Sequence, residues 1–137
     1  MYIEDSLKTE GTSTIHLTAG GEIEITSSGA NGLKTEGNSA IDLVSEGHVT
    51  ITSLAAHGIN AEGTSIVQVD AGSAMEAAAA NPVLSHVQIT APQGNGIRAE
   101  GTAEVAVHAT GECLIEGMNA DAAVQTEGDA LITARAE

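Results

Sequence analysis

The sequence predicts an all-β fold, a right-handed parallel β-helix (β-solenoid) with three short strands per coil of about 26 residues and about 4.5 coils. Three observations predict it. A short phrase ending in Glu-Gly returns along the chain, apolar and polar residues alternate between its copies, and the alternation keeps one offset in every unit. We therefore expect a single domain, residues 1–137, built from stacked copies of one unit.

The repeated phrase opens each unit and reads LKTEG, INAEG, IRAEG or VQTEG. Its first residues are Leu7, Leu33, Ile59, Ile97 and Val124. The spacings between them are 26, 26, 38 and 27 residues, a period typical of repeat architectures. The third unit is therefore the one that carries an insertion.

Two further strands are expected in each unit, because triplets such as IHL, IEI, VTI and VQV alternate with a period of two. The first set of paired apolar residues is Ile15 and Leu17, Ile41 and Leu43, Val67 and Val69, Val105 and Val107. The second set is Ile23 and Ile25, Val49 and Ile51, Val87 and Ile89, Cys113 and Ile115. Stacking would turn these into aliphatic core columns, with Cys113 a small core residue. A sandwich of hairpins, the rival all-β fold, would not require the same offset in every unit.

The insertion is SAMEAAAANPVLS, residues 73–85. Ser73 and Glu76 match a capping box, the alanine run favours a helix, and Asn81-Pro82 would end it. We expect a short helix that projects from the solenoid before the third strand of its unit. Side excursions of this kind are where solenoids carry binding functions, although a neutral insertion is equally compatible with the sequence.

The composition limits the possible partners. Four basic and 19 acidic residues give a net charge of −15, which argues against nucleic acid and anionic membranes. No apolar run is long enough for a membrane span, so no membrane insertion is expected. The start of the chain, MYIEDSLKTE, has neither the basic region nor the apolar stretch of a signal peptide.

Stacking would also align the outward charges. The glutamates of the repeated phrase form one predicted ladder: Glu10, Glu36, Glu62, Glu100 and Glu127. Two residues before them stand Lys8, Lys34, Asn60, Arg98 and Gln125. The simplest interpretation is a solvated ladder of ion pairs. An alternative is capture of a divalent cation such as Ca²⁺ at Glu62, where Asn60 replaces the base.

A second outward column holds Glu22, His48, His86 and Glu112, provided that His86 is aligned correctly across the insertion. Two imidazoles flanked by two carboxylates could form a zinc or nickel site, so Zn²⁺ is a possible cofactor. The alternative is a row of polar residues at the start of an exposed strand. His16, His57 and His108 fall in other columns and give no signal.

An enzyme is not expected. Glycoside hydrolysis uses two carboxylates at a set separation beside a sugar cleft, and nothing here singles out such a pair. The only aromatic residue is Tyr2, so a cleft would lack stacking platforms. A fragment of a β-helical, polysaccharide-active enzyme and a divalent-cation-binding solenoid remain the alternatives to a structural protein.

The stretch STIHLTAGGEIEITSSGANGLKTEGNSAIDLVSEGHVTIT resembles the passenger repeats of autotransporter-type (type V secreted) adhesins and related S-layer-like surface proteins. The resemblance covers most of residues 7–137 and is one of repeat style. It implies export to the cell surface and a role in adhesion or in a surface layer, with a host or matrix surface ligand as a possible partner. The export signal would not lie in this chain, and the chain has no Arg-Gly-Asp attachment triplet.

The ends of the predicted solenoid suggest a further partner. Solenoids need capping units, whereas here the first strand begins at once and the chain stops at LITARAE. Open strand edges invite pairing, either with a second copy, giving a fibre, or with neighbouring coils of a longer parent chain. The overall expectation is a non-catalytic, structural or adhesive, extracellular or cell-surface β-solenoid.

Overall fold

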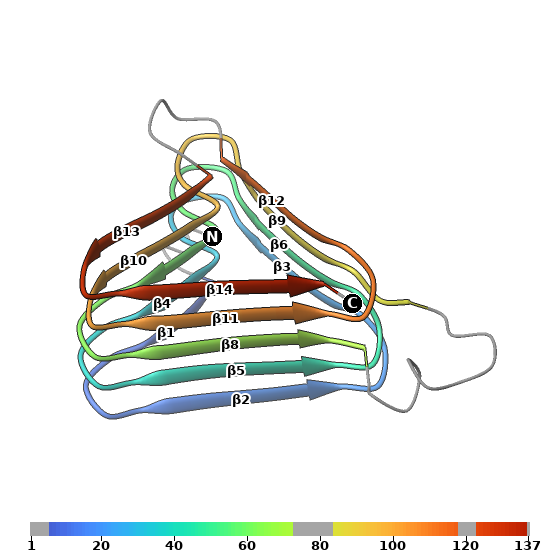
Figure 1. Cartoon of the computed structure of the whole chain (residues 1–137), viewed down its shortest axis with the longest axis horizontal. Helices are drawn as coiled ribbons and strands as arrows, with labels where there is room; N and C mark the ends of the chain where they lie inside the picture. The colour runs from blue at the N-terminus through green and yellow to red at the C-terminus, as the bar shows by residue number, and fades with distance from the viewer. Residues whose placement is uncertain (1–5, 73–83, 118–122, 137) are drawn as a thin grey trace.

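The computed structural model describes residues 6–72, 84–117 and 123–136. The chain winds through four coils of three strands each and adds two strands of a further coil. All strand pairings among the described residues are parallel. The result is a right-handed β-solenoid of triangular outline, which confirms the predicted fold class (Figure 1).

Three parallel sheets form the walls of the triangle. Sheet A contains β1 (Leu7–Thr9), β4 (Leu33–Thr35), β7 (Ile59–Ala61), β10 (Ile97–Gly101) and β13 (Val124–Gly128). Sheet B contains β2 (Thr14–Ala19), β5 (Ala40–Ser45), β8 (Ile66–Ala71), β11 (Glu104–Ala109) and β14 (Leu131–Ala136). Sheet C contains β3 (Ile23–Ser27), β6 (Val49–Ser53), β9 (Val87–Ala91) and β12 (Cys113–Gly117).

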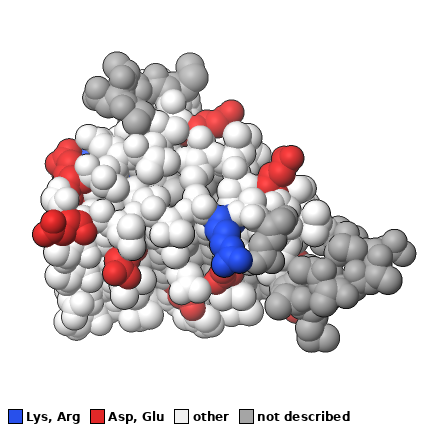
Figure 2. Space-filling model, in the orientation of Figure 1, with Lys and Arg blue, Asp and Glu red and all other residues white. Residues whose placement is uncertain are grey.

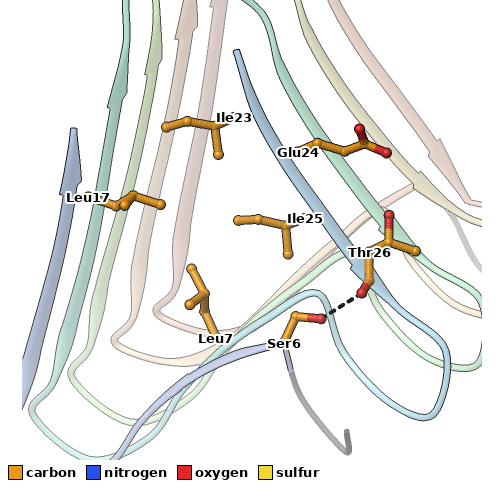
Figure 3. A pocket seen from close by; sticks show the side chains of 7 residues that line it. All are labelled: Ser6, Leu7, Leu17, Ile23, Glu24, Ile25 and Thr26. Atoms are coloured by element: carbon orange, nitrogen blue, oxygen red, sulfur yellow. Dashed lines mark hydrogen bonds between the residues drawn. The ribbon is translucent and has the colours of Figure 1, made fainter. Parts of the chain in front are cut away.

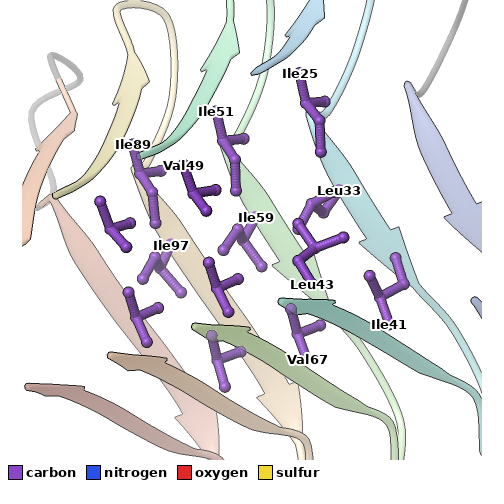
Figure 4. Packing of buried hydrophobic residues seen from close by; sticks show 14 of the residues in the cluster. Ile25, Leu33, Ile41, Leu43, Val49, Ile51, Ile59, Val67, Ile89 and Ile97 are labelled. Atoms are coloured by element: carbon purple, nitrogen blue, oxygen red, sulfur yellow. The ribbon is translucent and has the colours of Figure 1, made fainter. Parts of the chain in front are cut away.

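The register places like on like, as the constant offsets predict. Ile15 pairs with Ile41, and Ile41 pairs with Val67. Across the insertion, Val49 pairs with Val87, so the predicted realignment of the third unit is correct. Aliphatic side chains from the three sheets meet inside the triangle, and those of the middle coils are fully buried (Figure 4). Cys113 lies in its predicted inward column and is partly buried against the core.

The core also contains hydroxyl groups that face one another at one corner. Thr9 donates a hydrogen bond to Ser39 (3.0 Å), and Thr35 lies 2.7 Å from Ser65. The next position of this series is occupied by alanine on both sides, Ala61 and Ala103, and both are fully buried. Replacing both partners of a buried hydrogen bond by apolar groups leaves no unsatisfied donor or acceptor. Between the third and fourth coils, the hydroxyl pair is therefore replaced by two alanines, and neither side is left with an unpaired buried hydroxyl.

The Glu-Gly of the repeated phrase is explained by the corner that follows sheet A. All five of its glycines have positive φ, from 68° at Gly11 to 79° at Gly63, a conformation that glycine adopts without steric cost. Their carbonyl groups accept hydrogen bonds from the next coil, for example Thr64 N–H to Gly37 O at 2.8 Å. The phrase is thus the same strand and corner built once per coil.

The predicted helix, with Ser73, Glu76, Asn81 and Pro82, lies outside the described residues, so the structure does not test it. The last two residues of the insertion, 84 and 85, follow the predicted end of the helix; they are described and are not helical. Ser85 is buried, and its N–H donates a hydrogen bond to Thr110 Oγ1 (3.0 Å). The chain has therefore rejoined the solenoid by Ser85. The described residues contain no helix that could cross a membrane.

Candidate functional site

The column that opens the strands of sheet C is formed as the sequence predicts. The amide of Ile23 donates to the carbonyl of His48, that of Val49 to His86, and that of Val87 to Glu112, each at 2.9 Å. Glu22, His48, His86 and Glu112 therefore occupy equivalent positions on four successive coils. The imidazole rings of His48 and His86 stack in parallel, with centroids 5.0 Å apart and planes 3° apart.

Both imidazole rings accept a hydrogen bond from a backbone amide of the following coil, a role that the sequence did not reveal. The N–H of His86 donates to Nδ1 of His48 (2.9 Å), and the N–H of Glu112 donates to Nδ1 of His86 (2.7 Å). A neutral imidazole has one acceptor nitrogen and one that carries the proton. Nδ1 is the acceptor in both rings, so Nε2 carries the proton and points away from the backbone contact.

This arrangement does not support the metal hypothesis for Glu22, His48, His86 and Glu112. An Nε2 that carries a proton has no free lone pair for Zn²⁺, and Nδ1 is already used by a backbone amide. Within residues 6–72, 84–117 and 123–136, no group of three or more His, Cys, Asp or Glu side chains is placed to hold a metal ion. Metal binding here would require both backbone contacts to break.

The same column borders a shallow polar hollow of about 250 Å³ on the outer face of sheet C. It is lined by Glu22, His48, Thr50, His86 and Gln88. The chain rejoins the solenoid from the insertion at Ser85, directly before His86, so the hollow includes the first residue after the insertion. The lining offers hydrogen-bond donors and acceptors and few apolar groups.

His57 extends the backbone-capping pattern to the corner between sheets C and A. Its Nδ1 accepts a hydrogen bond from the N–H of Asn95 (3.0 Å), and its own N–H donates to Oδ1 of Asn31 (3.2 Å). Burial lowers the pKa of His57 below its usual value, and the positive charge of Arg98 lowers it further, against the opposing effect of Glu62. Its ring is therefore held neutral by both geometry and surroundings.

The acidic ladder has the predicted geometry on sheet A. Lys8 pairs with Glu10 and lies 3.8 Å from Glu36 of the next coil, and Lys34 pairs with Glu36 at 2.7 Å. Arg98 repeats the pattern, since it pairs with Glu100 and lies 3.4 Å from Glu127. Each of these three bases thus pairs with the carboxylate of its own coil, and Lys8 and Arg98 also reach the carboxylate of the next coil.

The pKa values of Glu36 and Glu100, two members of the ladder, are shifted in opposite directions. The hydrogen bond from Lys34 lowers the pKa of Glu36. Burial raises the pKa of Glu100, and this outweighs the opposing charge of Arg98. The ladder is thus an exposed to half-buried ion-pair network. Among the charged side chains on the face shown in Figure 2, acidic ones outnumber basic ones.

Asn60 takes the place of a base in the third coil. Its Nδ2 donates to Oε1 of Glu62 at 2.9 Å, so the amide supplies the donor that Lys34 and Arg98 supply elsewhere. Its Oδ1 is buried and has no hydrogen-bond partner among the described residues. A buried oxygen cannot ligate a cation at the surface, so the geometry does not favour the predicted capture of Ca²⁺ by Asn60 and Glu62.

The first coil presents an apolar hollow of about 350 Å³ at the open end of the solenoid (Figure 3). Its lining is Ser6, Leu7, Leu17, Ile23, Glu24, Ile25 and Thr26. Leu17 is 39% exposed there, whereas Leu43 in the same column of the next coil is fully buried. The hollow is thus a stretch of core that no further strand of the described chain covers.

Comparison of the chain with models of known protein families, with curated protein sequences and with solved structures finds no match. The function must therefore be argued from the residues of this chain alone.

The capping residue His57 predicts an acid-sensitive fold. The pKa of His57 is lowered in the folded chain, so the unfolded chain binds a proton first as the pH falls below 6.5. The free energy of unfolding should therefore be highest above pH 6.5 and decrease below it until the folded-state pKa is passed. His57→Asn should make this decrease shallower, as measured by urea unfolding at several pH values above about 5, where carboxylates stay ionised.

His108→Asn is the matched control, because His108 faces Asp70 at 3.6 Å and its loss should not flatten the decrease. An unchanged acid response in His57→Asn would contradict the assignment of His57 as a neutral cap.

Proposed function

We propose that the chain is a structural element, a rigid β-solenoid of an extracellular or cell-surface assembly, whose coils continue by stacking on a second copy. The observation that carries this proposal is the state of the two end coils. Leu17 is 39% and Val124 40% exposed, although both belong to inward columns whose middle members are fully buried. Covering such surfaces is the main favourable term in association.

The two ends also match in pattern along sheets A and B. In a head-to-tail joint, β1 of one copy would lie on β13 of the other, and β2 would lie on β14. Leu7 would extend the column that ends in Val124, and Ile15 would extend the column that ends in Ile132. Parallel strands with one open edge offer the backbone groups for such pairing.

The charged and polar residues on the two sides of this joint would have the same order as a pair of neighbouring coils inside the solenoid. Gln125 donates to Glu127 at 3.2 Å, as Asn60 donates to Glu62. In the interior, the next coil supplies Arg98 and Glu100, whereas at the joint it would supply Lys8 and Glu10. The sequence of charges across the joint would thus be one that the fold accommodates elsewhere.

Adhesion would fall to the outward columns. The polar hollow at His48 and His86, which the chain reaches directly after the insertion of residues 73–85, is the best placed for a host or matrix surface ligand. The acidic surface supports an exported, well-solvated protein and gives no support to nucleic acid as a partner. The resemblance to adhesin repeats supports the same location.

Electron microscopy of the purified chain over a range of concentrations tests the proposal. We expect fibres whose axial repeat is close to the length of one protomer, and we expect Leu17→Lys to shorten or abolish them, because a charge would enter the apolar joint. Leu54→Lys is the control, since Leu54 is 50% exposed on a corner away from the open end.

Isolated short rods at every concentration would contradict stacking on a second copy. They would point instead to coverage of the end coils by neighbouring coils of a longer parent chain.

A further inference from the structure

A linked set of side chains on the outer face of sheet B has no role in the structural function proposed above. Nδ1 of His16 lies 2.8 Å from Oδ2 of Asp42, and Oγ1 of Thr18 lies 3.0 Å from Nε2 of His16. His16 and Thr18 are two residues apart on β2 and so share a face, and Asp42 lies directly opposite His16 on β5. The strand register therefore brings together these three residues from the first and second coils.

The carboxylate fixes the tautomer of this histidine. An ionised carboxylate can only accept, so Nδ1 of His16 carries the proton that Asp42 receives in a hydrogen bond. Nε2 is then left with a lone pair, and the hydroxyl of Thr18 donates to it. This is the opposite tautomer to that of His48, His57 and His86, whose Nδ1 atoms accept backbone amides.

Asp42 is suited to support a positive charge on His16. Its second oxygen, Oδ1, is buried and has no hydrogen-bond partner among the described residues. The contact of Oδ2 with the imidazole of His16 is therefore the one that can offset the negative charge of Asp42. A carboxylate in this position orients the ring and stabilises the imidazolium that forms when the ring accepts a proton. The side chain of His16 is 60% exposed and Thr18 is exposed, so solutes can reach both.

We propose that Thr18, His16 and Asp42 form a nucleophile, general base and orienting carboxylate that accept acyl groups from activated esters. A hydroxyl within reach of a base that a third group orients is the arrangement that activates a nucleophile. Oγ1 of Thr18 bonds to the acyl carbon as its proton passes to Nε2 of His16. The bond from the acyl carbon to the leaving oxygen breaks, and that oxygen takes the proton from His16. Water then releases the acid from Thr18, with His16 again as the base.

The solenoid contains a natural comparison on the same sheet. His108 lies 3.6 Å from Asp70, beyond the distance of a good hydrogen bond. The residue two positions after His108, the place that Thr18 holds relative to His16, is Thr110, which is buried and accepts a hydrogen bond from the N–H of Ser85. This half-buried histidine–aspartate pair, with no exposed hydroxyl at that place, therefore reports the background reactivity of an imidazole beside a carboxylate.

The test is hydrolysis of p-nitrophenyl acetate by the whole purified chain, followed by mass spectrometry to locate the acetyl group. We expect acetylation of Thr18, and we expect Thr18→Val, His16→Asn and Asp42→Asn to lower the rate by about 10- to 100-fold. His108→Asn should leave the rate unchanged. These positions lie on the exposed face and Val suits a strand, so circular dichroism should show that the variants are folded.

Three results would each overturn the proposal. The first is hydrolysis by Thr18→Val at the wild-type rate, which would reduce the set to imidazole catalysis. The second is an equal loss of rate in all variants, including His108→Asn. The third is an acetyl group found on another residue. None of these results would bear on fibre formation, which is tested separately.

Discussion

Leu43→Ala should lower the free energy of unfolding by about 2–5 kcal/mol. Leu43 is fully buried in the second coil, where its column continues to Leu17 on one side and Val69 on the other. Removing three carbon atoms loses their transfer free energy and leaves a cavity. Parallel strands are held at a spacing of about 4.8 Å by their backbone hydrogen bonds, so the neighbouring coils cannot close that cavity. Chemical unfolding followed by circular dichroism would measure the loss.

Leu17→Ala provides the matched control for this prediction. Leu17 occupies the same column but is 39% exposed at the open end, so less surface is lost and no closed cavity forms. We expect less than half the effect of Leu43→Ala. Equal effects would mean that the middle coils are not packed more tightly than the first.

Gly58→Ala is the second large prediction, with an expected loss of about 1–3 kcal/mol or more from overpacking. A Cβ atom at Gly58 would lie 2.6 Å from the carbonyl oxygen of Gly96 and 2.5 Å from Cγ2 of Ile89. The carbonyl cannot retreat freely, because it accepts the hydrogen bond from the amide of Ile59 at 2.9 Å. The change would therefore separate two coils or displace a core isoleucine, and thermal unfolding would record it.

Gly20→Ala is the control for Gly58→Ala. No atom lies within 4 Å of a Cβ built at Gly20, and its φ is not positive. Its free energy of unfolding should change by no more than about 0.5 kcal/mol. If both glycine variants lost the same free energy of unfolding, close stacking of the coils before β7 would not explain why position 58 is a glycine.

The fold could be predicted in detail because a solenoid repeats its core. Each coil sets the same residue type at the same offset, so Ile41 and Val67 could be stacked by counting alone, and the ladder of Lys34 and Glu36 followed from the same count. The alignment of His86 with His48 across the insertion was also predictable, since the apolar pair after it fixes the strand.

The chemistry of the outward columns was less predictable, because counting gives the position of a side chain and not the direction of its atoms. His48 and His86 were expected side by side as a metal pair, yet their Nδ1 atoms accept the amides of the next coil. That contact depends on the rotation of each ring, which no spacing encodes.

The set on sheet B illustrates what a fuller use of the register could have found. His16 and Asp42 are 26 residues apart, one full period, so their pairing was contained in the repeat. The hydroxyl of Thr18 could then be placed on the same face by the period of two. The sequence does not draw attention to these three residues, because they lie in two different columns and follow no sequence motif.

The most direct test of stacking in register is the protonation of the histidine rings, measured by nitrogen-15 NMR of the side chains at mildly alkaline pH. Coils that stack as described predict a proton on Nε2 of His48, His57 and His86, with Nδ1 bound to a backbone amide. They predict a proton on Nδ1 of His16. A proton on Nδ1 of His48 and His86, or free exchange of the proton between their two nitrogens, would contradict stacking in this register. In that case the second and third coils would not be joined across the insertion as described.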